Sequence, residues 1–319
     1  MHANQIFNLY RDADFLTEED CADFLVIVRD DDAPDDGAMA VTGLTLSLLE
    51  RQWNEERLFL FMKAYSISTS DIVRERIVVG LLLLMLKYNL QFRESSDLQD
   101  AVQDILTDDP ELCYTALCNI ARTVQVKYLE KFNQQMAKEI MPLMNQVNSD
   151  EFFEVVSKHQ SEIDRIGRMH LDQNYLIFKT AYYTDFFRSQ AANWFLPWND
   201  DQLLNLPEDE REQFKNILNT WFLCDSDKYA LIGMSSMIRN TLRDQLQADT
   251  LAQLGETLGN PMILANGYVQ QLYRYFRLSS FTQSTPFDLV PYMRDMLVYR
   301  LVVVGDRAKK VINELLNVL

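Results

Sequence analysis

Glycine and proline are scarce in this sequence, with only 9 and 8 among its 319 residues. These two residues supply most of the turns in loop-rich β proteins and much of the composition of disordered chains. Their scarcity therefore argues against both classes. Apolar residues make up 48% of the chain, and leucine, alanine, glutamate and glutamine are plentiful. Since these four residue types favour helices, the composition predicts an all-α fold with a large core.

Cysteine and histidine are also rare. The three histidines (His2, His159 and His170) do not combine with cysteines in a zinc-type spacing, so we expect no metal site. His159 and His170 stand among charged residues, which indicates surface or boundary positions. The four cysteines are too scattered for a disulfide framework, which fits a reducing cytoplasm. They are Cys21, Cys113, Cys118 and Cys224.

Signatures of catalysis are missing as well. The nine glycines stand apart, so neither glycine-rich phosphate-binding motif occurs. No arrangement of serine, histidine and aspartate, or of cysteine and histidine, indicates a nucleophile. We therefore expect neither a cofactor nor an enzymatic activity.

No apolar run is long enough to cross a bilayer. The longest, Ile77 to Leu86 between Arg76 and Lys87, has about half of the ~20 residues that a membrane span needs. It predicts a buried helix. The first twenty residues turn acidic at once, so no signal peptide is visible.

Basic residues are outnumbered by acidic ones, 30 to 47, which gives a net charge of −17. Nucleic acid and anionic membranes would on the whole be repelled. The imbalance is concentrated in residues 1–110, which hold 22 acids and 9 bases. This acidic third favours a basic protein segment as partner, in our interpretation.

Helical periodicity appears along most of the chain, and strand-type alternation is nowhere sustained. Thr17, Ser70 and Ser96 mark helix starts, and the sequence DDDAPDDG at 30–37 predicts a loop in which Pro34 and Gly37 break the helix. The residues 41–48 and 55–65 predict one helical hairpin. Further helices are expected at 71–89, 111–137, 150–184, 208–222, 226–246, 262–277 and 287–317.

The segment 71–89 resembles the inner helix of a HEAT-type repeat. Asp71 and Arg74 stand at its polar start, and the small Gly80 lets a neighbouring helix approach closely. Consecutive hairpins that cannot bury their apolar faces alone predict stacking. We therefore expect an α-solenoid of degenerate HEAT/armadillo-like and TPR-like hairpins, with one region at 1–147 and a second at 148–319. The inner helices of such an array would supply specificity for a partner.

One acidic cluster suggests an enzyme instead. Asp31, Asp32 and Asp35 match the DDxxD spacing with which all-helical prenyl-diphosphate enzymes hold Mg²⁺. That chemistry needs a second acidic cluster facing the first, and none follows at a suitable place. We favour a solvated loop. The sequence CDSD at 224–227 lacks the glycine and glutamate of a calcium loop, and we expect Asp225 or Ser226 to cap a helix.

Five aromatic residues gather around Pro197: Phe186, Phe187, Trp194, Phe195 and Trp198. We expect them on successive helical turns until Pro197 ends the helix and turns Trp198 outward. Rigid aromatic side chains near a helix end suit a protein-docking surface. They also suit a seam between two packed segments, which we favour.

Three motifs in this order resemble a family of large helical tetratricopeptide-repeat proteins from Bacteroidetes: NWFLPW (193–198), CDSDKYAL (224–231) and QQLYRYFRL (270–278), followed by PF at 286–287. Residues 40–89 and 131–145 are similar to the family's N-terminal helical region. The resemblance implies a non-catalytic helical scaffold with a C-terminal repeat array, which the segment 299–316 would begin. Together, these observations predict a scaffold that binds another protein.

Overall fold

The structure of the protein is a computed structural model that describes residues 3–140, 157–161, 172, 174–175, 178–179, 182–208, 211–212, 214–215, 218, 223–233, 261–282, 284–302 and 306–317. Within these residues the chain is helical and no strand occurs, so the predicted all-α class is confirmed. No helix in this part of the chain has the length and apolar character of a membrane span.

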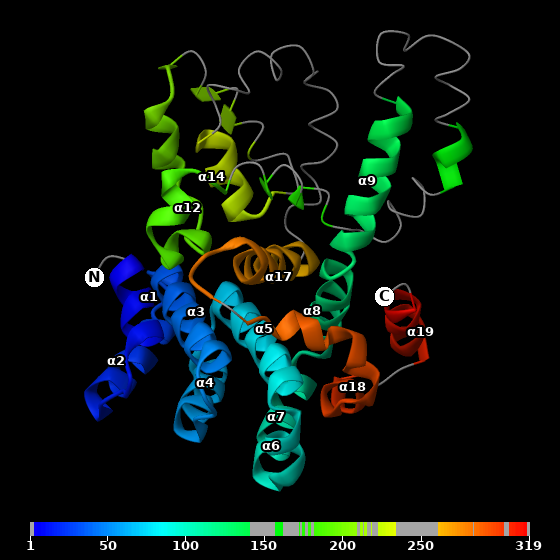
Figure 1. The fold of residues 1–319 in the computed structure, drawn as a ribbon. Coiled ribbons are helices and arrows are strands. Elements are labelled where there is room, and N and C mark those ends of the chain that lie inside the picture. Colours follow the sequence, from blue (N-terminus) through cyan, green and yellow to red (C-terminus); the bar gives the residue numbers. More distant parts are fainter. Residues whose placement is uncertain are drawn as a thin grey trace.

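From α1 to α9 the helices follow one another with short connections (Figure 1). The N-terminal ones are α1 (Ala3–Asp12), α2 (Glu18–Arg29), α3 (Pro34–Glu50), α4 (Glu55–Ile67), α5 (Asp71–Lys87), α6 (Asn89–Glu94), α7 (Ser96–Asp108), α8 (Pro110–Thr123) and α9 (Val126–Ile140). Beyond them lie α12 (Asp185–Ser189), the 3₁₀ helices η2 (Ala191–Trp194) and η3 (Asp200–Asn205), α14 (Asp225–Gly233), α17 (Pro261–Leu278), the 3₁₀ helix η5 (Pro286–Asp295), α18 (Leu297–Val302) and α19 (Asp306–Leu316).

The helices between α2 and α8 pack in two rows. An outer row is formed by α2, α4 and α7, and an inner row by α3, α5 and α8. Neighbours within each row touch, and each outer helix contacts the inner helix that follows it in the chain. Each pair α2/α3, α4/α5 and α7/α8 is therefore a hairpin that packs against the next one.

Helix α5 lies at the centre of the core. Every residue from Glu75 to Leu86 is buried, which confirms that the longest apolar run forms a buried helix. The predicted close approach at Gly80 is also confirmed, because a Cβ atom there would lie 2.8 Å from Phe61 Cζ and 3.0 Å from Thr45 Oγ1. Glycine at this position lets α3 and α4 approach the backbone of α5.

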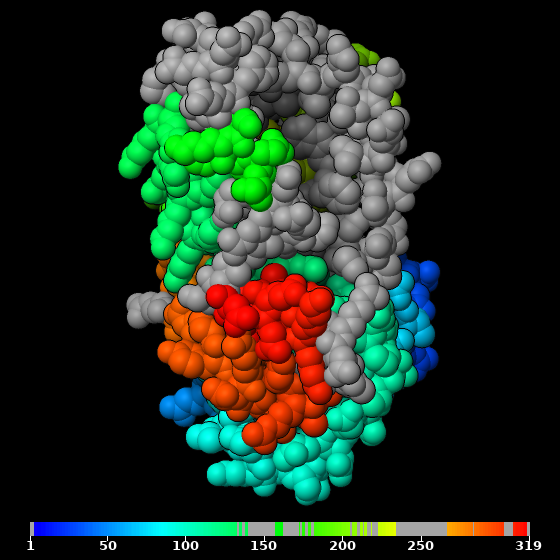
Figure 2. All heavy atoms as spheres, turned by 90° about the vertical axis from the view of Figure 1, so that its right-hand side faces the viewer, coloured from blue at the N-terminus to red at the C-terminus, as the bar shows by residue number. Residues whose placement is uncertain are grey.

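The C-terminal elements return to the inner row. α17 packs on α5 and α8, η5 and α18 pack on α5, and α19 packs on α8. Gln125 fixes α19 by donating from Nε2 to the carbonyl of Leu315 (2.7 Å). Figure 2 shows α19 on the surface beside α18 and η5. One hydrophobic cluster joins residues from both predicted regions, whereas their boundary at 147/148 lies outside the described residues.

The helix starts confirm several sequence signals. Thr17 caps α2 in a reciprocal capping box with Asp20. Ser70 occupies the cap position of α5 without a side-chain bond, and Ser95 rather than Ser96 caps α7.

Three predicted boundaries are wrong. Pro34 begins α3 instead of breaking a helix, because its missing N–H and fixed φ suit the first helical position. Gly37 is inside α3, where a Cβ atom would lie 2.9 Å from Val73 Cγ2. The expected helix 111–137 is broken between α8 and α9, and the expected helix 287–317 divides into η5, α18 and α19, with Pro291 inside η5. The expected helix 150–184 lies mostly outside the described residues.

The crossing of α1 and α3 gives a first prediction. A Cβ atom on Gly43 would lie 2.4 Å from the carbonyl oxygen of Phe7, a backbone atom that cannot move alone. We expect Gly43→Ala to push α1 off α3 and to lower the free energy of unfolding by about 1 to 3 kcal/mol, as overpacking does. Urea unfolding followed by circular dichroism measures the change.

Gly233→Ala is the matched control, since its Cβ atom would lie at an ordinary 3.5 Å from Thr184 Cγ2. It should be neutral or slightly stabilising, because alanine favours helices over glycine. Equal stability of the two variants would contradict the close crossing.

Candidate functional site

The five aromatic residues singled out in the sequence meet three tyrosines from later helices. We call this group the aromatic junction. It consists of Phe186, Phe187, Trp194, Phe195, Trp198, Tyr229, Tyr268 and Tyr275. It brings together α12, η2, α14 and α17, and it adjoins α1.

The backbone of the junction is not the continuous helix that we expected. α12 ends at Ser189, Gln190 is extended (φ −148°, ψ 140°), and η2 ends at Trp194, before Pro197. Asn193 stabilises this break, because its Nδ2 donates to the carbonyl of Phe186 (2.7 Å). The early helix end places Trp194 and Phe195 on the inner side of the junction.

Trp194 and Phe195 are the buried centre. Trp194 is 2% exposed, its Nε1 donates to the carbonyl of Phe187 (2.9 Å), and its ring packs on Phe187 and Tyr275. Phe195 is fully buried between Phe7 of α1 and Tyr275 of α17. Together with the buried Phe187, these residues join the first helix of the chain to α17.

Phe186 and Trp198 lie at the rim and are half-buried. Both pack on Tyr229 of α14, with ring centroids 4.7 and 5.1 Å away. Trp198 Nε1 donates to Asp200 Oδ1 (2.8 Å), and the hydroxyl of Tyr229 donates to the carbonyl of Pro197 (2.9 Å). Trp198 therefore packs on α14, while part of its side chain remains exposed.

A buried arginine of α5 links the junction to the inner row. Arg76 is 2% exposed and donates to the carbonyl of Ala38 (3.1 Å), to Thr42 Oγ1 (2.8 Å) and to the carbonyl of Phe195 (3.2 Å). Its guanidinium carbon lies 4.9 Å from the centre of the Tyr268 ring. A buried arginine is costly unless its donors are satisfied, so this residue fixes α3, α5, η2 and α17 in one geometry.

A second buried arginine neutralises two aspartates. Arg274 of α17 is fully buried and forms a bidentate pair with Asp172, from Nη2 to Oδ1 (2.7 Å) and from Nε to Oδ2 (3.1 Å). It also donates to Asp227 Oδ1 (2.6 Å) and contacts Cys224 Sγ (3.1 Å). Burial alone would lower the pKa of Arg274, but the carboxylates of Asp172 and Asp227 raise it, so it remains charged.

The segment 224–227 is therefore structural. The expected cap by Asp225 or Ser226 is wrong, since α14 begins at Asp225. Asp227, in the first turn of α14, accepts from the N–H of Cys224 just before the helix (3.3 Å). Burial raises the pKa of the Cys224 thiol, which therefore stays protonated and is no nucleophile.

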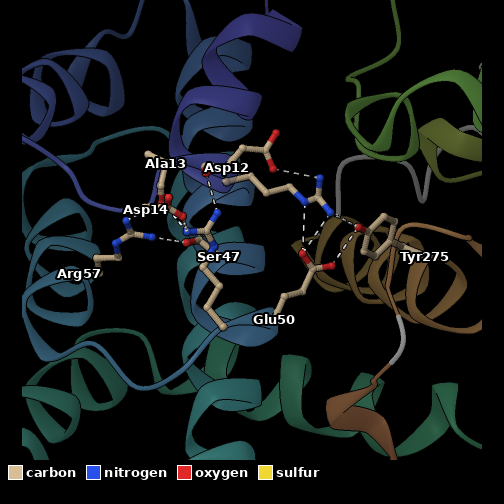
Figure 3. A network of polar contacts seen from close by, with 9 residues as sticks. Asp12, Ala13, Asp14, Ser47, Glu50, Arg57 and Tyr275 are labelled. Carbon is tan, nitrogen blue, oxygen red and sulfur yellow. Dashed lines mark hydrogen bonds and ion pairs between the residues drawn. The ribbon is translucent and has the colours of Figure 1, made fainter.

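A half-buried network joins the first and the inner helices to α17 (Figure 3). Arg11 of α1 donates to Glu50 Oε2 of α3 (3.3 Å) and to the hydroxyl of Tyr275 (3.0 Å). That hydroxyl donates to Glu50 Oε1 (2.9 Å), so the three residues form a closed cycle of hydrogen bonds. Burial raises the pKa of Glu50, and Arg11 opposes the shift.

The end of α1 is held by two further arginines in the same view (Figure 3). Arg51 donates to the carbonyls of Asp12 (2.6 Å) and Ala13 (2.7 Å), and Arg57 donates to that of Ala13 (2.8 Å). Carbonyls at the C-terminal end of a helix lack partners within the helix and carry its partial negative charge. The two guanidinium groups supply hydrogen-bond donors for these carbonyls and a positive charge beside the negative end of the helix.

One buried carboxyl is left without a counterion in hydrogen-bond contact. Glu75 of α5 is 4% exposed, and its Oε1 has no hydrogen-bond partner in the described structure. Burial raises its pKa to about 8; Arg76 lowers the pKa and Asp225 raises it. Glu75 is therefore mostly protonated at neutral pH.

The residues of the enzymatic hypothesis do not form a visible site. Asp31 accepts from the hydroxyl of Thr69, Asp32 lies in the same exposed loop, and Asp35 is in the first turn of α3. Over the described residues, no group of three His, Cys, Asp or Glu side chains could hold a metal ion. The DDxxD hypothesis gains no support from this geometry.

The other rare residues are placed as follows. Cys113 and Cys118 are buried in α8, Cys224 is buried and Cys21 is partly exposed; all four are free thiols. His159 is 8% exposed; its Nε2 contacts Glu139 Oε2 (2.9 Å) and its ring packs on Phe132. His2 and His170 lie outside the described residues.

The sequence interpretation missed the polar part of the junction. Arg76, Arg274 and Glu75 are charged residues inside otherwise apolar helical segments. Such positions are the available signal, because a charge on a buried helix face requires a partner. The partners of Arg76 and Arg274 come from distant segments and could not be read from local patterns.

Comparisons with known proteins returned no match among family models, curated proteins or solved structures. The motif resemblance to the Bacteroidetes family therefore rests on the residues alone.

The junction gives a second prediction. Trp194→Ala should lower the free energy of unfolding by about 3 to 5 kcal/mol, because it leaves a cavity among buried rings and removes a buried hydrogen bond. Trp198→Ala, at the half-buried rim, should cost clearly less. Chemical unfolding measures both. An unchanged unfolding curve for Trp194→Ala together with lost partner binding would instead assign its ring to docking.

Glu75 gives a third prediction. Its pKa of about 8 in the folded chain exceeds the ordinary 4.5, so between these values the unfolded chain loses the proton first. Glu75 therefore makes stability fall as pH rises through this window, by up to about 1.4 kcal/mol per pH unit, with no further change above it.

Glu75→Gln should remove this fall in the free energy of unfolding. The variant should therefore become increasingly more stable than the wild type as the pH rises from 5 to 8. Urea unfolding at several pH values measures the difference. Parallel pH profiles for the two proteins would show that Glu75 ionises normally in the fold.

Proposed function

We propose that the protein is a non-catalytic helical scaffold that binds another protein through the exposed side of its outer row. The hairpins α2/α3, α4/α5 and α7/α8 support a HEAT-like repeat array, since each packs on the next. Gly80 is further support, because it lies at a close crossing of neighbouring helices and the HEAT resemblance expects a small residue there. In a scaffold of this kind, binding depends on the shape and charge of an extended surface.

We place the partner on the outer row because other helices of the chain already cover the inner row. α1, α17, η5, α18 and α19 occupy the inner helices, which we had expected to supply specificity. The outward residues of α2, α4 and α7 remain exposed. A partner is therefore expected on the outer row.

This exposed face is acidic. α7 presents four aspartates on one side, at the helical spacing i, i+3, i+7 and i+11: Asp97, Asp100, Asp104 and Asp108. Glu18, Glu19 and Asp23 of α2 and Glu55 and Glu56 of α4 are exposed as well. The exposed bases on the three helices are Arg29 and Lys63. Such a surface favours a basic protein segment and disfavours nucleic acid and anionic membranes.

We also propose membership of the Bacteroidetes tetratricopeptide-repeat family. The support is that its three motifs form one unit in space: NWFLPW supplies Trp194 and Phe195, CDSDKYAL supplies Asp227, and QQLYRYFRL supplies Arg274 and Tyr275. The four free cysteines fit the reducing cytoplasm suggested by composition.

A capture experiment tests the scaffold function. The full chain is immobilised, exposed to an extract of native cells, and washed at rising salt before mass spectrometry. We expect a defined partner whose retention falls with salt, because exposed charges are screened.

The matched control is the triple variant Asp97→Asn, Asp100→Asn and Asp104→Asn, which keeps the outer helix but neutralises its exposed stripe. It should retain less of the partner. If the wild-type chain holds no protein above empty resin, the scaffold function is wrong. If the amount of partner retained changes with neither salt nor these substitutions, only the hypothesis that charge guides binding is wrong.

A further inference from the structure

Two exposed apolar side chains lie on neighbouring helices of the outer row. Val26 of α2 is 69% exposed and Phe59 of α4 is 43% exposed. A third, Phe15, is 75% exposed just before α2. Single exposed apolar residues are ordinary, whereas several on adjoining elements indicate an interaction surface.

The two helices run in parallel, which places Val26 and Phe59 near the same level. Cys21 of α2 is close to Glu56 of α4, near the start of both helices, since Glu56 acts electrostatically on its thiol. After the two helices end, Thr69 donates to Asp31. With this alignment, Phe59 and Val26 are separated along the helix axes by roughly a turn or two.

Acids outnumber bases along this face. The exposed acids Glu18, Glu19, Glu55 and Glu56 lie at the starts of the two helices. Further along, beyond Phe59 and Val26, exposed Lys63 and Arg29 lie near the equally exposed residues Asp30–Asp32. Acids in a first turn also stabilise the helix itself, but this role does not account for the exposed apolar residues that follow them.

We propose that the exposed face of α2 and α4 binds an amphipathic helix of the partner protein, and this inference rests on the scaffold function. The bound helix places basic residues over the acidic end and apolar residues over Val26 and Phe59. Helix-on-helix docking by a few apolar anchors is a common mode of peptide recognition. The exposed acids at the starts of α2 and α4 are complementary to these basic residues.

The probe is a synthetic helical peptide with lysines in its first two turns and a leucine stripe in its centre. Its binding to the full chain is followed by fluorescence anisotropy at low and moderate salt. A scrambled peptide of the same composition is the reference. We expect the amphipathic peptide to bind more tightly than the scrambled one, with an affinity that falls with salt.

The decisive variant is Val26→Ser with Phe59→Ser, which changes no charge and no buried side chain. It should raise the Kd of the amphipathic peptide by about tenfold or more, which is the effect of losing one to two apolar anchors. Leu90→Ser on α6 removes another exposed apolar side chain, 66% exposed, and should leave binding unchanged. Glu55→Gln with Glu56→Gln should reduce the salt dependence.

Equal affinity of the serine double variant and the wild type would overturn the inference, and so would equal affinity of the scrambled peptide. The native partner separates this failure from failure of the scaffold function. If the serine double variant captures that partner as well as the wild type does, the scaffold function stands and the partner binds elsewhere.

Discussion

The described structure depends on the satisfaction of one buried guanidinium. Arg76 stands in the middle of the core and reaches α3 through Ala38 and Thr42, the junction through Phe195, and α17 through Tyr268. Because an unpaired buried charge is strongly destabilising, all of these segments must be in place together. Arg274 imposes the same condition on α14 and α17. The two arginines make the C-terminal elements part of the same core as the N-terminal hairpins.

This arrangement explains why the aromatic residues are grouped around Pro197. Rings can fill the irregular space between α12, η2 and α17 only if the chain stops being helical there, and Asn193 satisfies the carbonyl that the break exposes. Tyr229 of α14 donates its hydroxyl to the carbonyl of Pro197, and Tyr275 of α17 donates to the carboxylate of Glu50. The junction thus combines apolar burial with a small number of directed polar bonds, which together specify one packing.

Local features of this fold could be predicted from the sequence, and long-range ones could not. Neighbouring residues in the sequence determine the cap at Thr17, the buried run after Arg76 and the small residue at Gly80. Pro34 was misjudged because the same residue breaks a helix interior and begins a helix. The bond from Arg76 to Phe195 spans 119 residues, and no periodicity encodes such a pairing. The aromatic cluster was visible in the sequence, but its tyrosine and arginine partners were not.

The buried thiol of Cys224 has a consequence for studying motions of this protein. Its sulfur is enclosed by Asp227, Ser226 and Arg274, whereas Cys21 on α2 is partly exposed. An alkylating reagent will reach Cys224 only during excursions that separate α14 from α17. In a chain whose buried Cys113 and Cys118 are replaced, the rate at which Cys224 is labelled, compared with that of Cys21, therefore reports transient opening of the core around Arg274.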